Sequence, residues 1–419
     1  MGVARDPAVA EDGFASRRRG RAVLGGIVGL AALIGGLVDC APGGGAPTDR
    51  GGSPRATASA AAETSMTALR AAFPGVLDGQ LAPAKRSAEV TLPATADGTV
   101  RLTDSGSGVS VGFRLVGATP SGPQRTDAHV TYPRGGPEGA DLVHHLGGAG
   151  VEDFVAFWRA PDKEALFYEL EIGTAAGLRL VAGSLEMLDG QGAPRLRVAP
   201  PYVVDRRGAR HAASLSVEGC AVDTSPAPPW GRSPVEPGAD SCRLVVRWPP
   251  NLDYPLLVDP QWQSTSNQLA NARRRATATL LQPGEPSSLV VIAGGFSGTG
   301  SALTSTELYH PLSRSFASTG SLNTARGDHA AASLRNTSPT PAGSPVVVTG
   351  GRQTLGGSLV STNVLEVFDP TTGQWTADAV SALPRAGHTA TLLQDDTVLL
   401  VGGIGINGTP RNTGAIYAY

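Results

Sequence analysis

Residues 289–295 read LVVIAGG, residues 345–351 read PVVVTGG, and residues 397–403 read TVLLVGG. Each segment is a short run of mostly aliphatic residues that ends in two glycines. Aliphatic β-branched residues favour strands, and a glycine pair suits a tight bend where a side chain would clash. The pairs begin at 294, 350 and 402, so the unit recurs at roughly fifty residues. Such a period predicts a repeat architecture whose units are built from strands.

Further residues recur in register with the glycine pairs. An arginine precedes each pair, an aromatic residue stands ten or eleven positions before each arginine, and a histidine follows the last two arginines. A glutamate and then another aromatic residue follow the first two pairs. The positions are Trp262, Arg273, Gly294, Gly295, Glu307 and Tyr309, then Phe316, Arg326, His329, Gly350, Gly351, Glu366 and Phe368, then Trp375, Arg385, His388, Gly402 and Gly403. Ala276 takes the place of the histidine in the first unit.

In this combination of positions, residues 261–419 resemble a kelch β-propeller. The resemblance implies blades of four strands, an aromatic residue that packs between blades, and a framework role for the histidines. It also implies that the loops at 296–304, 352–362 and 404–412 vary on a rigid frame and bind a ligand. Their Ser, Thr, Gly, Asn and Gln content suits a glycan or a protein surface.

The number of blades is unusual for a propeller. The chain enters the region on an aromatic fourth strand at Trp262 and runs through three sets of the other strands, but the last set has no fourth strand. Trp262 is expected to complete that set. Three blades fall below the four to eight usual for closed propellers. The sequence leaves three alternatives: a shortened reading frame, an arc that stays open, or a homodimer that pools its blades.

Residues 85–260 contain nine strand-like segments separated by glycine and proline turns, several of which alternate apolar with polar residues. This pattern predicts a β-sandwich or jelly-roll-like domain. The fold class is therefore all-β: a sandwich followed by an incomplete propeller of about three blades. This layout resembles that of large bacterial envelope proteins with kelch repeats. The segments are 88–92, 99–103, 109–115, 154–158, 166–172, 178–181, 195–198, 214–217 and 243–248.

Residues 1–40 predict a signal peptide or a membrane anchor. Arginines at 17–19 and 21 precede an uncharged run over 22–38, which has the form of a secretory signal and is marginal for a membrane span. The run stops at LVDC, residues 37–40, and this ending resembles a bacterial lipoprotein signal in which Cys40 is lipidated. Asp39 departs from that pattern, so an uncleaved anchor and ordinary secretion stay open. All three alternatives place the body of the protein in the cell envelope, outside the cytoplasm.

Residues 41–84 predict a flexible linker, because they are rich in Gly, Pro, Ala, Ser and Thr. A short helix is expected over 64–73, halted before Pro74. In the following domain, Cys220 and Cys242 each stand beside a predicted strand. In an oxidising compartment this pair predicts a disulfide, and two buried free thiols are the alternative.

The motifs of catalysis are weak in this sequence. Residues 108–112 read GVSVG, but the alternation continues as a strand, so Ser110 is expected on a strand and not on a nucleophile elbow. Residues 403–408 read GIGING, which we interpret as a turn because no helix follows. His144 and His145 are expected to be a solvated pair, since no metal-ligand spacing accompanies them. Residues 261–419 contain no cysteine, which argues against the tyrosine–cysteine cofactor of the galactose-oxidase relatives of kelch proteins. No cofactor is expected.

The net charge bears on the kind of partner. The 419 residues carry a net charge of −2, so no general attraction to nucleic acid is expected. We therefore expect a non-enzymatic, membrane-anchored binding protein whose kelch loops contact a glycan or protein. The alternatives are a carbohydrate-active or oxidative enzyme of the envelope, or a truncated inactive fragment.

Overall fold

The structure is a computed structural model that describes residues 66–77, 86–126, 129–266, 268–282, 288–335, 343–380 and 383–419. These residues fall within one compact unit, Gly52–Tyr419. The predicted leader, Cys40 and most of the predicted linker lie outside the described residues. Within the described ranges, no helix has the length and apolar character needed to cross a membrane.

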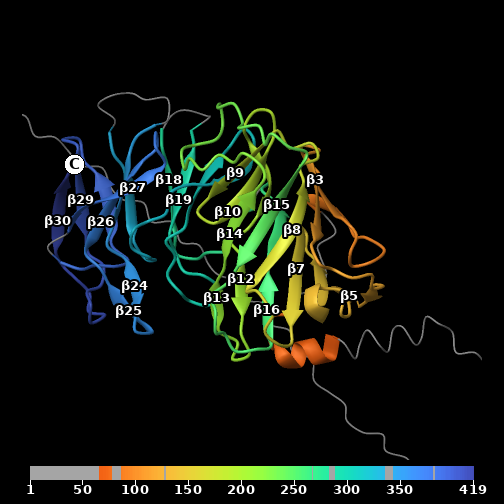
Figure 1. The fold of residues 1–419 in the computed structure, drawn as a ribbon. Coiled ribbons are helices and arrows are strands. Elements are labelled where there is room, and N and C mark those ends of the chain that lie inside the picture. Colours follow the sequence, from red (N-terminus) through yellow and green to blue (C-terminus); the bar gives the residue numbers. More distant parts are fainter. Residues whose placement is uncertain are drawn as a thin grey trace, which may run out of the picture. The chain divides into compact units, whose positions relative to one another are not determined.

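The protein is all-β, as the sequence predicts, and its strands form antiparallel sheets (Figure 1). The six-stranded sheet has the order β1 (Ala88–Thr91), β2 (Val100–Asp104), β3 (Ser110–Leu115), β8 (Ala165–Glu171), β15 (Ser241–Arg247) and β14 (Ser214–Glu218). Each of the nine segments predicted within residues 85–260 overlaps a strand of this sheet or of the next one.

The eleven-stranded sheet contains the remaining strands of the first half of the chain. Its order is β13 (Arg210–Ala212), β12 (Tyr202–Val204), β16 (Leu256–Asp259), β7 (Gly150–Phe157), β17 (Gln261–Ser264), β11 (Pro194–Val198), β10 (Ser184–Leu188) and β9 (Gly177–Val181). Off this path, β6 (Asp141–Leu146) pairs with β7, β5 (His129–Tyr132) with β6, and β4 (Gln124–Arg125) with β5. A short 3-10 helix, η1 (Pro137–Gly139), precedes β6.

One apolar core joins these two sheets. On β8, inward residues such as Tyr168 are buried and alternate with outward residues such as Glu169, which is the period of a strand with one buried face. The rings of Phe113 and Trp262 stack with centroids 3.8 Å apart, and Tyr168 meets Trp262 edge-on at 5.9 Å. All three rings belong to this core, and aromatic pairs of this kind bury a large apolar area.

The position of Trp262 corrects the sequence analysis. Trp262 was expected on the fourth strand of a repeat, but it lies on β17, which pairs with β7 on one side and β11 on the other. Its side chain is fully buried in the core between the first two sheets. The strand therefore cannot complete the last repeat.

A helix over residues 66–72 covers part of the eleven-stranded sheet. Met66, Leu69 and Phe73 are buried against a second apolar cluster that includes Phe154 and Leu257. Apolar residues at this helical spacing form one face, and burial of that face stabilises a helix too short to persist alone. The described part of the predicted 64–73 helix is thus a cover for the sheet.

Three smaller sheets repeat one plan in the second half of the chain. The first repeat sheet is β18 (Thr277–Leu280), β19 (Val290–Ala293), β20 (Thr306–His310) and β21 (Ser315–Ser318). The second is β22 (Ala330–Ser333), β23 (Val346–Thr349), β26 (Val364–Asp369) and β27 (Gln374–Val380). The third is β28 (Thr389–Leu392), β29 (Thr397–Val401) and β30 (Gly414–Ala418). The quoted glycine-pair segments contain β19, β23 and β29, the second strand of each sheet.

The repeat sheets pack face to face through apolar side chains. Val291 and Leu308 of the first sheet share a core with Val348 and Phe368 of the second. On its other face the second sheet presents Val347 to a cluster that includes residues of the third sheet. The second sheet has apolar residues on both of its faces, so each face is covered by a neighbouring sheet. The glycine pairs and the strand alternation do not by themselves specify this stacking.

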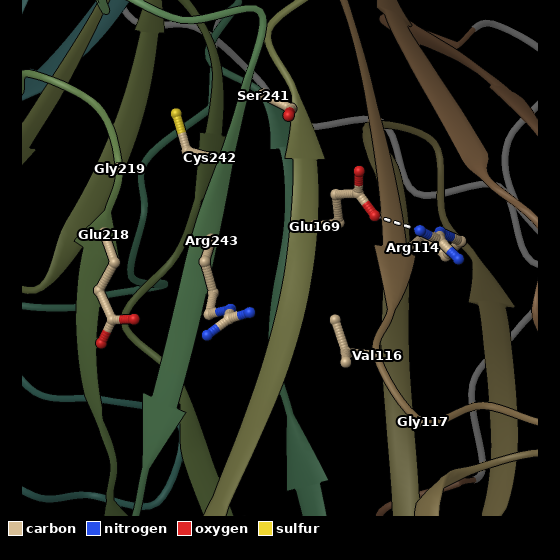
Figure 2. A pocket seen from close by; sticks show the side chains of 9 residues that line it. All are labelled: Arg114, Val116, Gly117, Glu169, Glu218, Gly219, Ser241, Cys242 and Arg243. Carbon is tan, nitrogen blue, oxygen red and sulfur yellow. Dashed lines mark hydrogen bonds and ion pairs between the residues drawn. The ribbon is translucent and has the colours of Figure 1, made fainter.

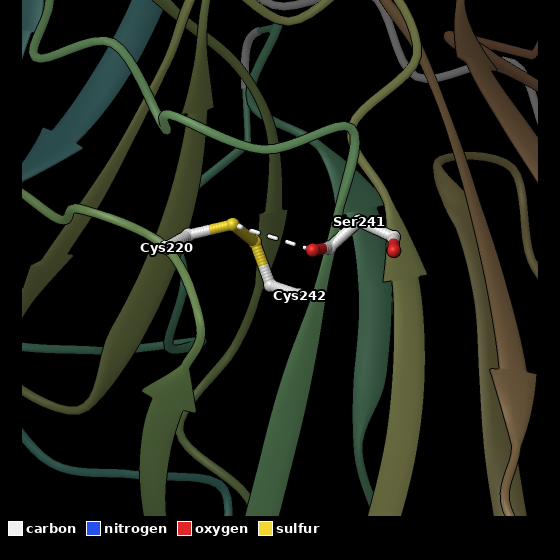
Figure 3. Close-up of a disulfide and its surroundings, with 3 residues drawn as sticks. All are labelled: Cys220, Ser241 and Cys242. Atoms are coloured by element: carbon white, nitrogen blue, oxygen red, sulfur yellow. Dashed lines mark hydrogen bonds between the residues drawn. A yellow bond between two sulfur atoms is a disulfide. The ribbon is translucent and has the colours of Figure 1, made fainter.

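Cys220 and Cys242 form a disulfide beside the ends of β14 and β15 (Figure 3). Their Cα atoms are 5.6 Å apart, and Cys242 is buried at the rim of the main core. The bond closes the segment between the two strands, which carries Trp230 toward the first repeat sheet.

Replacing both Cys220 and Cys242 with serine should lower the thermal midpoint. Loop-closure entropy for a separation of 22 residues corresponds to about 3 kcal/mol of lost stability. Thermal unfolding monitored by circular dichroism measures the effect, with the wild-type protein plus reductant as the matched control. An unchanged midpoint in the double variant would show that the bond contributes nothing to stability.

Candidate functional site

A buried arginine ties the second strand to the third in each repeat sheet. Its Nη1 donates to two main-chain carbonyls: that of the first glycine of the pair, and that of the residue before or at the start of the third strand. The distances are 2.9 and 2.8 Å for Arg273 to Gly294 and Ser305, 2.9 and 2.6 Å for Arg326 to Gly350 and Val364, and 3.0 and 3.1 Å for Arg385 to Gly402 and Thr413. The guanidinium fork suits two acceptors held at a fixed spacing.

A glutamate pairs with this arginine in the first two sheets only. The Arg273–Glu307 contact is 2.8 Å and the Arg326–Glu366 contact is 2.6 Å, and all four side chains are at most 2% exposed. In the third sheet the register places Ala415 at the equivalent position, opposite Leu400. Burial and the nearby Arg411 lower the pKa of Arg385. The sequence shows that the third unit has no glutamate after its glycine pair. Only the strand register shows that Ala415 takes the place of the glutamate that would pair with Arg385.

Glu307 also binds an arginine from the eleven-stranded sheet. Arg197 donates from Nη1 to Glu307 at 3.0 Å and from Nη2 to the Phe316 carbonyl at 3.3 Å. Nearby, Glu186 accepts the Ser318 amide at 2.6 Å and pairs with Arg179 at 2.6 Å. These charged groups are fully buried, so each must be paired or hydrogen-bonded. The network therefore joins the first half of the chain to the first repeat sheet.

Sequence reasoning missed this junction. Arg179, Glu186 and Arg197 occupy one register row across β9, β10 and β11. In the sequence they alternate with apolar residues, which is the pattern of a strand with a solvated outer face. The outer face here is buried because the first repeat sheet lies on it.

Each framework histidine reaches back to the preceding repeat sheet. His329 Nε2 lies 2.9 Å from Thr277 Oγ1, and His388 Nε2 lies 2.7 Å from Thr349 Oγ1. Burial, with Arg326 nearby, lowers the pKa of His329 to about 3. Burial, with Arg385 nearby, lowers the pKa of His388 to about 4. Ala276 stands in the histidine position of the first sheet, whose preceding neighbour is the eleven-stranded sheet instead of a repeat.

The glycine pairs form the main-chain contacts between repeat sheets. The Gly295 amide donates to the Arg326 carbonyl at 2.8 Å, and the Gly351 amide donates to the Arg385 carbonyl at 2.9 Å. The preceding glycines, Gly294 and Gly350, have positive φ of 58° and 59°, and a Cβ there would overlap the same arginine carbonyls. Glycine is thus required by close approach as well as by conformation.

Three short hairpins follow the glycine pairs at one end of the repeat sheets. Phe296 bridges Ala302, the pair β24 (Arg352–Leu355) and β25 (Ser358–Ser361) forms a two-stranded sheet, and Ile404 bridges Pro410. The segments expected as loops are therefore partly strand. Figure 1 labels β24 and β25 beyond the ends of the second repeat sheet.

These hairpins touch one another in order. The Ala302 amide donates to Thr354 Oγ1 at 3.4 Å, and Ser361 Oγ donates to the Gly405 carbonyl at 3.2 Å. We call residues 296–304, 352–362 and 404–412 the hairpin surface. Their sequences contain no Asp or Glu, and they carry Arg352 and Arg411.

Large aliphatic side chains on the hairpin surface are exposed to solvent. Leu355 is 54% exposed, Leu359 is 45% exposed and Ile406 is 55% exposed. Leu355 and Leu359 occupy adjacent register rows of the β24–β25 hairpin, so they project from opposite faces of it. Exposed large aliphatic side chains on neighbouring hairpins that contact one another make these hairpins a candidate for a binding surface.

A second candidate is a depression of 580 Å³ on the outer face of the six-stranded sheet (Figure 2). Arg114, Glu169, Arg243 and Glu218 form one register row across β3, β8, β15 and β14. Arg114 pairs with Glu169, as the dashed line in Figure 2 shows. Because the charges alternate in sign along the row, they neutralise each other, and the depression has no concentration of either charge.

The residues considered for catalysis lie apart from one another. Ser110 begins β3, and its hydroxyl accepts a hydrogen bond from Thr103 Oγ1 at 2.9 Å, which is a strand environment. Residues 405–408 form the turn between Ile404 and Pro410. In the described part of the chain, no group of three or more His, Cys, Asp or Glu side chains is placed to hold a metal ion.

The expectation of a solvated His144–His145 pair is wrong. His144 is 2% exposed and lies 3.0 Å from Asp153, and His145 lies 3.0 Å from Glu152. Both histidines lie on β6, and the register places them opposite these acids on β7. Successive residues on a strand point to opposite faces, and here both faces of the strand are covered.

Comparison with known proteins adds no family. No protein-family model matches this sequence, and no curated protein sequence shows significant similarity to it.

Acidification from pH 7 to pH 4.5 should destabilise the protein, in part through His329 and His388. Their pKa values are lowered in the folded state, so only the unfolded chain takes up these protons as the pH falls below about 6.5. Stability from the two sites is complete above that pH and declines toward their folded pKa values. Urea unfolding at both pH values, compared with a His329→Gln/His388→Gln variant, should show a smaller loss in the variant. Equal losses of unfolding free energy in the wild type and the variant would show that His329 and His388 do not cause the pH dependence.

Proposed function

We propose that residues 261–419 form an incomplete kelch-type β-propeller that follows a β-sandwich. Support comes from the repeated contacts: the arginine, the glycine pair and the histidine make equivalent interactions at each junction between repeat sheets. The shared core between the six-stranded and eleven-stranded sheets supports the sandwich. On this reading, the eleven-stranded sheet takes the place of a blade before the first repeat, since Arg197 binds Glu307 there.

We propose that the protein is a non-enzymatic binding protein and that its hairpin surface contacts the ligand. The observation that carries this proposal is the exposure of Leu355 and Leu359 on the second hairpin and of Ile406 on the third, in a row of three hairpins that contact one another. Each hairpin is anchored to the buried arginine framework at its base, which limits the entropy lost on binding.

The chemistry of the hairpin surface favours a protein ligand over a glycan. Burying aliphatic side chains gains about 25 cal/mol per Å² of apolar area, but hydroxyl groups buried against them lose their hydrogen bonds with water. A protein offers an apolar surface, whereas a glycan is largely hydroxylated.

We further propose that the protein acts in the cell envelope, anchored through a lipid on Cys40. Basic residues before an apolar run that ends in cysteine support this location. The Cys220–Cys242 bond supports an oxidising compartment.

Replacing Cys40 with alanine should abolish the incorporation of a labelled fatty acid into the protein, because the thiol that carries the lipid would be lost. Immunoprecipitation after metabolic labelling measures the incorporation, and a Cys220→Ser/Cys242→Ser variant serves as a cysteine control that stays labelled. Absence of label from the wild-type protein would favour an uncleaved anchor or ordinary secretion.

A Leu355→Ser/Leu359→Ser/Ile406→Ser variant should lose its partner while keeping its fold. A few exposed anchors commonly supply most of the affinity of an interface, so the loss should be at least about tenfold. Affinity purification from the native envelope, followed by titration of the recovered partner, measures the effect.

The matched control for that experiment is Leu312→Ser. Leu312 is 71% exposed but lies in the turn between β20 and β21, outside the hairpin surface. Partner binding that survives the triple variant, or that falls equally in the control, would overturn the proposed surface.

A further inference from the structure

Trp158 is the most exposed of the five tryptophans in this protein. Its side chain directly follows the last residue of β7 (Figure 1) and is 44% exposed, whereas Trp248, Trp262 and Trp375 are at most 6% exposed. A tryptophan carries a large apolar area and is usually covered. An indole left open to solvent is therefore a candidate contact for a ligand.

A buried carboxylate fixes the orientation of this indole. Trp158 Nε1 donates to Asp141 Oδ2 at 2.8 Å, and Asp141, the first residue of β6, is only 9% exposed. The second carboxylate oxygen, Oδ1, accepts the Arg134 amide at 2.8 Å. Asp141 is thus held by two hydrogen bonds, and it ties the exposed ring to the sheet. A ring whose orientation is set before binding loses little conformational entropy when a ligand stacks on it.

Trp158 lines a cavity of 430 Å³. This volume lies within the range of sites that hold small molecules, and such sites commonly combine an aromatic wall with a few polar groups. Here the polar groups are two guanidinium groups and one carboxylate. The other lining residues are Arg134, Glu138, Gly139, Ala140, Phe157, Arg159 and Ala160.

The polar groups of this cavity are open to a ligand. Arg134 forms hydrogen bonds only through its main chain, and within the described ranges neither its guanidinium group nor that of Arg159 has a partner. The Glu138 carboxylate accepts the Asp162 amide at 3.1 Å, which leaves lone pairs for further donors. The cavity therefore offers unpaired cationic donors, an acceptor and an apolar ring.

The segment that carries two of these groups has an unusual main-chain shape. Arg134 has a φ of 52° and Glu138 a φ of 55°, in the left-handed region that residues with a Cβ seldom adopt. Hydrogen bonds hold it: Asp141 accepts the Arg134 amide, and the Gly136 amide donates to the Ala140 carbonyl at 2.9 Å. Such conformations persist only where surrounding contacts fix them, and they recur at ligand sites.

We propose that this cavity binds an acidic glycan, with the pyranose ring of a uronic acid unit stacked on the Trp158 indole. The C–H groups of a pyranose face are apolar and can cover the indole, whereas its hydroxyl groups need hydrogen-bonding partners. Arg134 and Arg159 donate to the carboxylate of the sugar, and Glu138 accepts from a hydroxyl group. Two unpaired guanidinium groups favour a sugar with a carboxylate over a neutral one.

This site lies on β6, β7 and the segment before β6, in the first half of the chain. It is separate from the hairpin surface of the repeat sheets, and it does not depend on the function proposed for that surface.

The proposal is tested by calorimetry of the full chain with three acidic tetrasaccharides, which are those of galacturonate, mannuronate and hyaluronan. At least one should bind at a single site. The methyl ester of that tetrasaccharide should bind at least about tenfold more weakly, because its carboxylates have lost their charge. Tetraglutamate, which has carboxylates but no pyranose ring to stack, should also bind at least about tenfold more weakly.

The place of binding is tested with three variants of the full chain. Arg159→Met keeps the length of the side chain without its charge, and Trp158→Ala removes the stacking surface, so each should weaken binding at least about tenfold. Quenching of tryptophan fluorescence by the bound sugar should disappear in Trp158→Ala. The matched control is Arg243→Met, which removes an exposed arginine on the outer face of the six-stranded sheet and should change the affinity less than about twofold. Circular dichroism checks that the variants are folded.

Four outcomes would overturn the proposal. The first is that none of the three tetrasaccharides binds. The second is equal affinity for the methyl ester or for tetraglutamate. The third is unchanged binding in the Arg159→Met variant, which alters an exposed side chain and keeps the test decisive if Trp158→Ala does not fold. The fourth is a loss of binding in Arg243→Met, which would place the glycan on the six-stranded sheet instead.

Discussion

The carboxylate of Glu307, held between Arg197 and Arg273, is the contact on which the arrangement of the two halves depends. All three side chains are buried, and the two arginines come from different halves of the chain. One guanidinium balances one carboxylate, so loss of Glu307 would leave two buried guanidinium groups beside each other without an anion. The eleven-stranded sheet and the first repeat sheet are therefore fixed to each other by electrostatics as well as by apolar contact.

The same set of contacts joins the first repeat sheet to the second and the second to the third. A glycine amide donates to the arginine carbonyl of the next sheet, and the histidine of the next sheet reaches back to a threonine. Each sheet then contacts only its neighbours, which is the organisation of repeat proteins. The hairpin surface follows from it, because each hairpin emerges directly after a glycine pair.

The sequence predicted those features that depend on local pattern. The glycine-pair segments contain strands, and the nine strand segments of the first half overlap strands, because apolar alternation and turn residues are local signals. The sequence pattern assigned Trp262 to a repeat sheet, because Trp262 precedes Arg273 by the same interval as the aromatic residues of the other repeats. That interval does not show which sheet the strand joins. The sequence pattern mistook the His144–His145 pair for solvent-facing residues, and it gave no sign that Arg197 is buried, because alternation shows that a face is polar and not whether that face is covered.

The candidate surfaces were predictable to different degrees. The positions of the three hairpins followed from the repeat, but their mutual contacts and the exposure of Leu355 and Ile406 required the structure. The sequence shows that the third unit lacks the glutamate found in the first two. Only the register places Ala415 at that position, which means that Arg385 has no carboxylate partner there.

A double-mutant cycle between Arg197 and Glu307 tests the central claim most directly. Arg197→Met, Glu307→Gln and the combined variant would be compared with the wild type by urea unfolding at neutral pH. The account predicts that each single change is strongly destabilising, and that the two losses differ from additivity by at least about 1 kcal/mol. Losses that add within about 0.5 kcal/mol would show that the two side chains act independently, and would contradict the account.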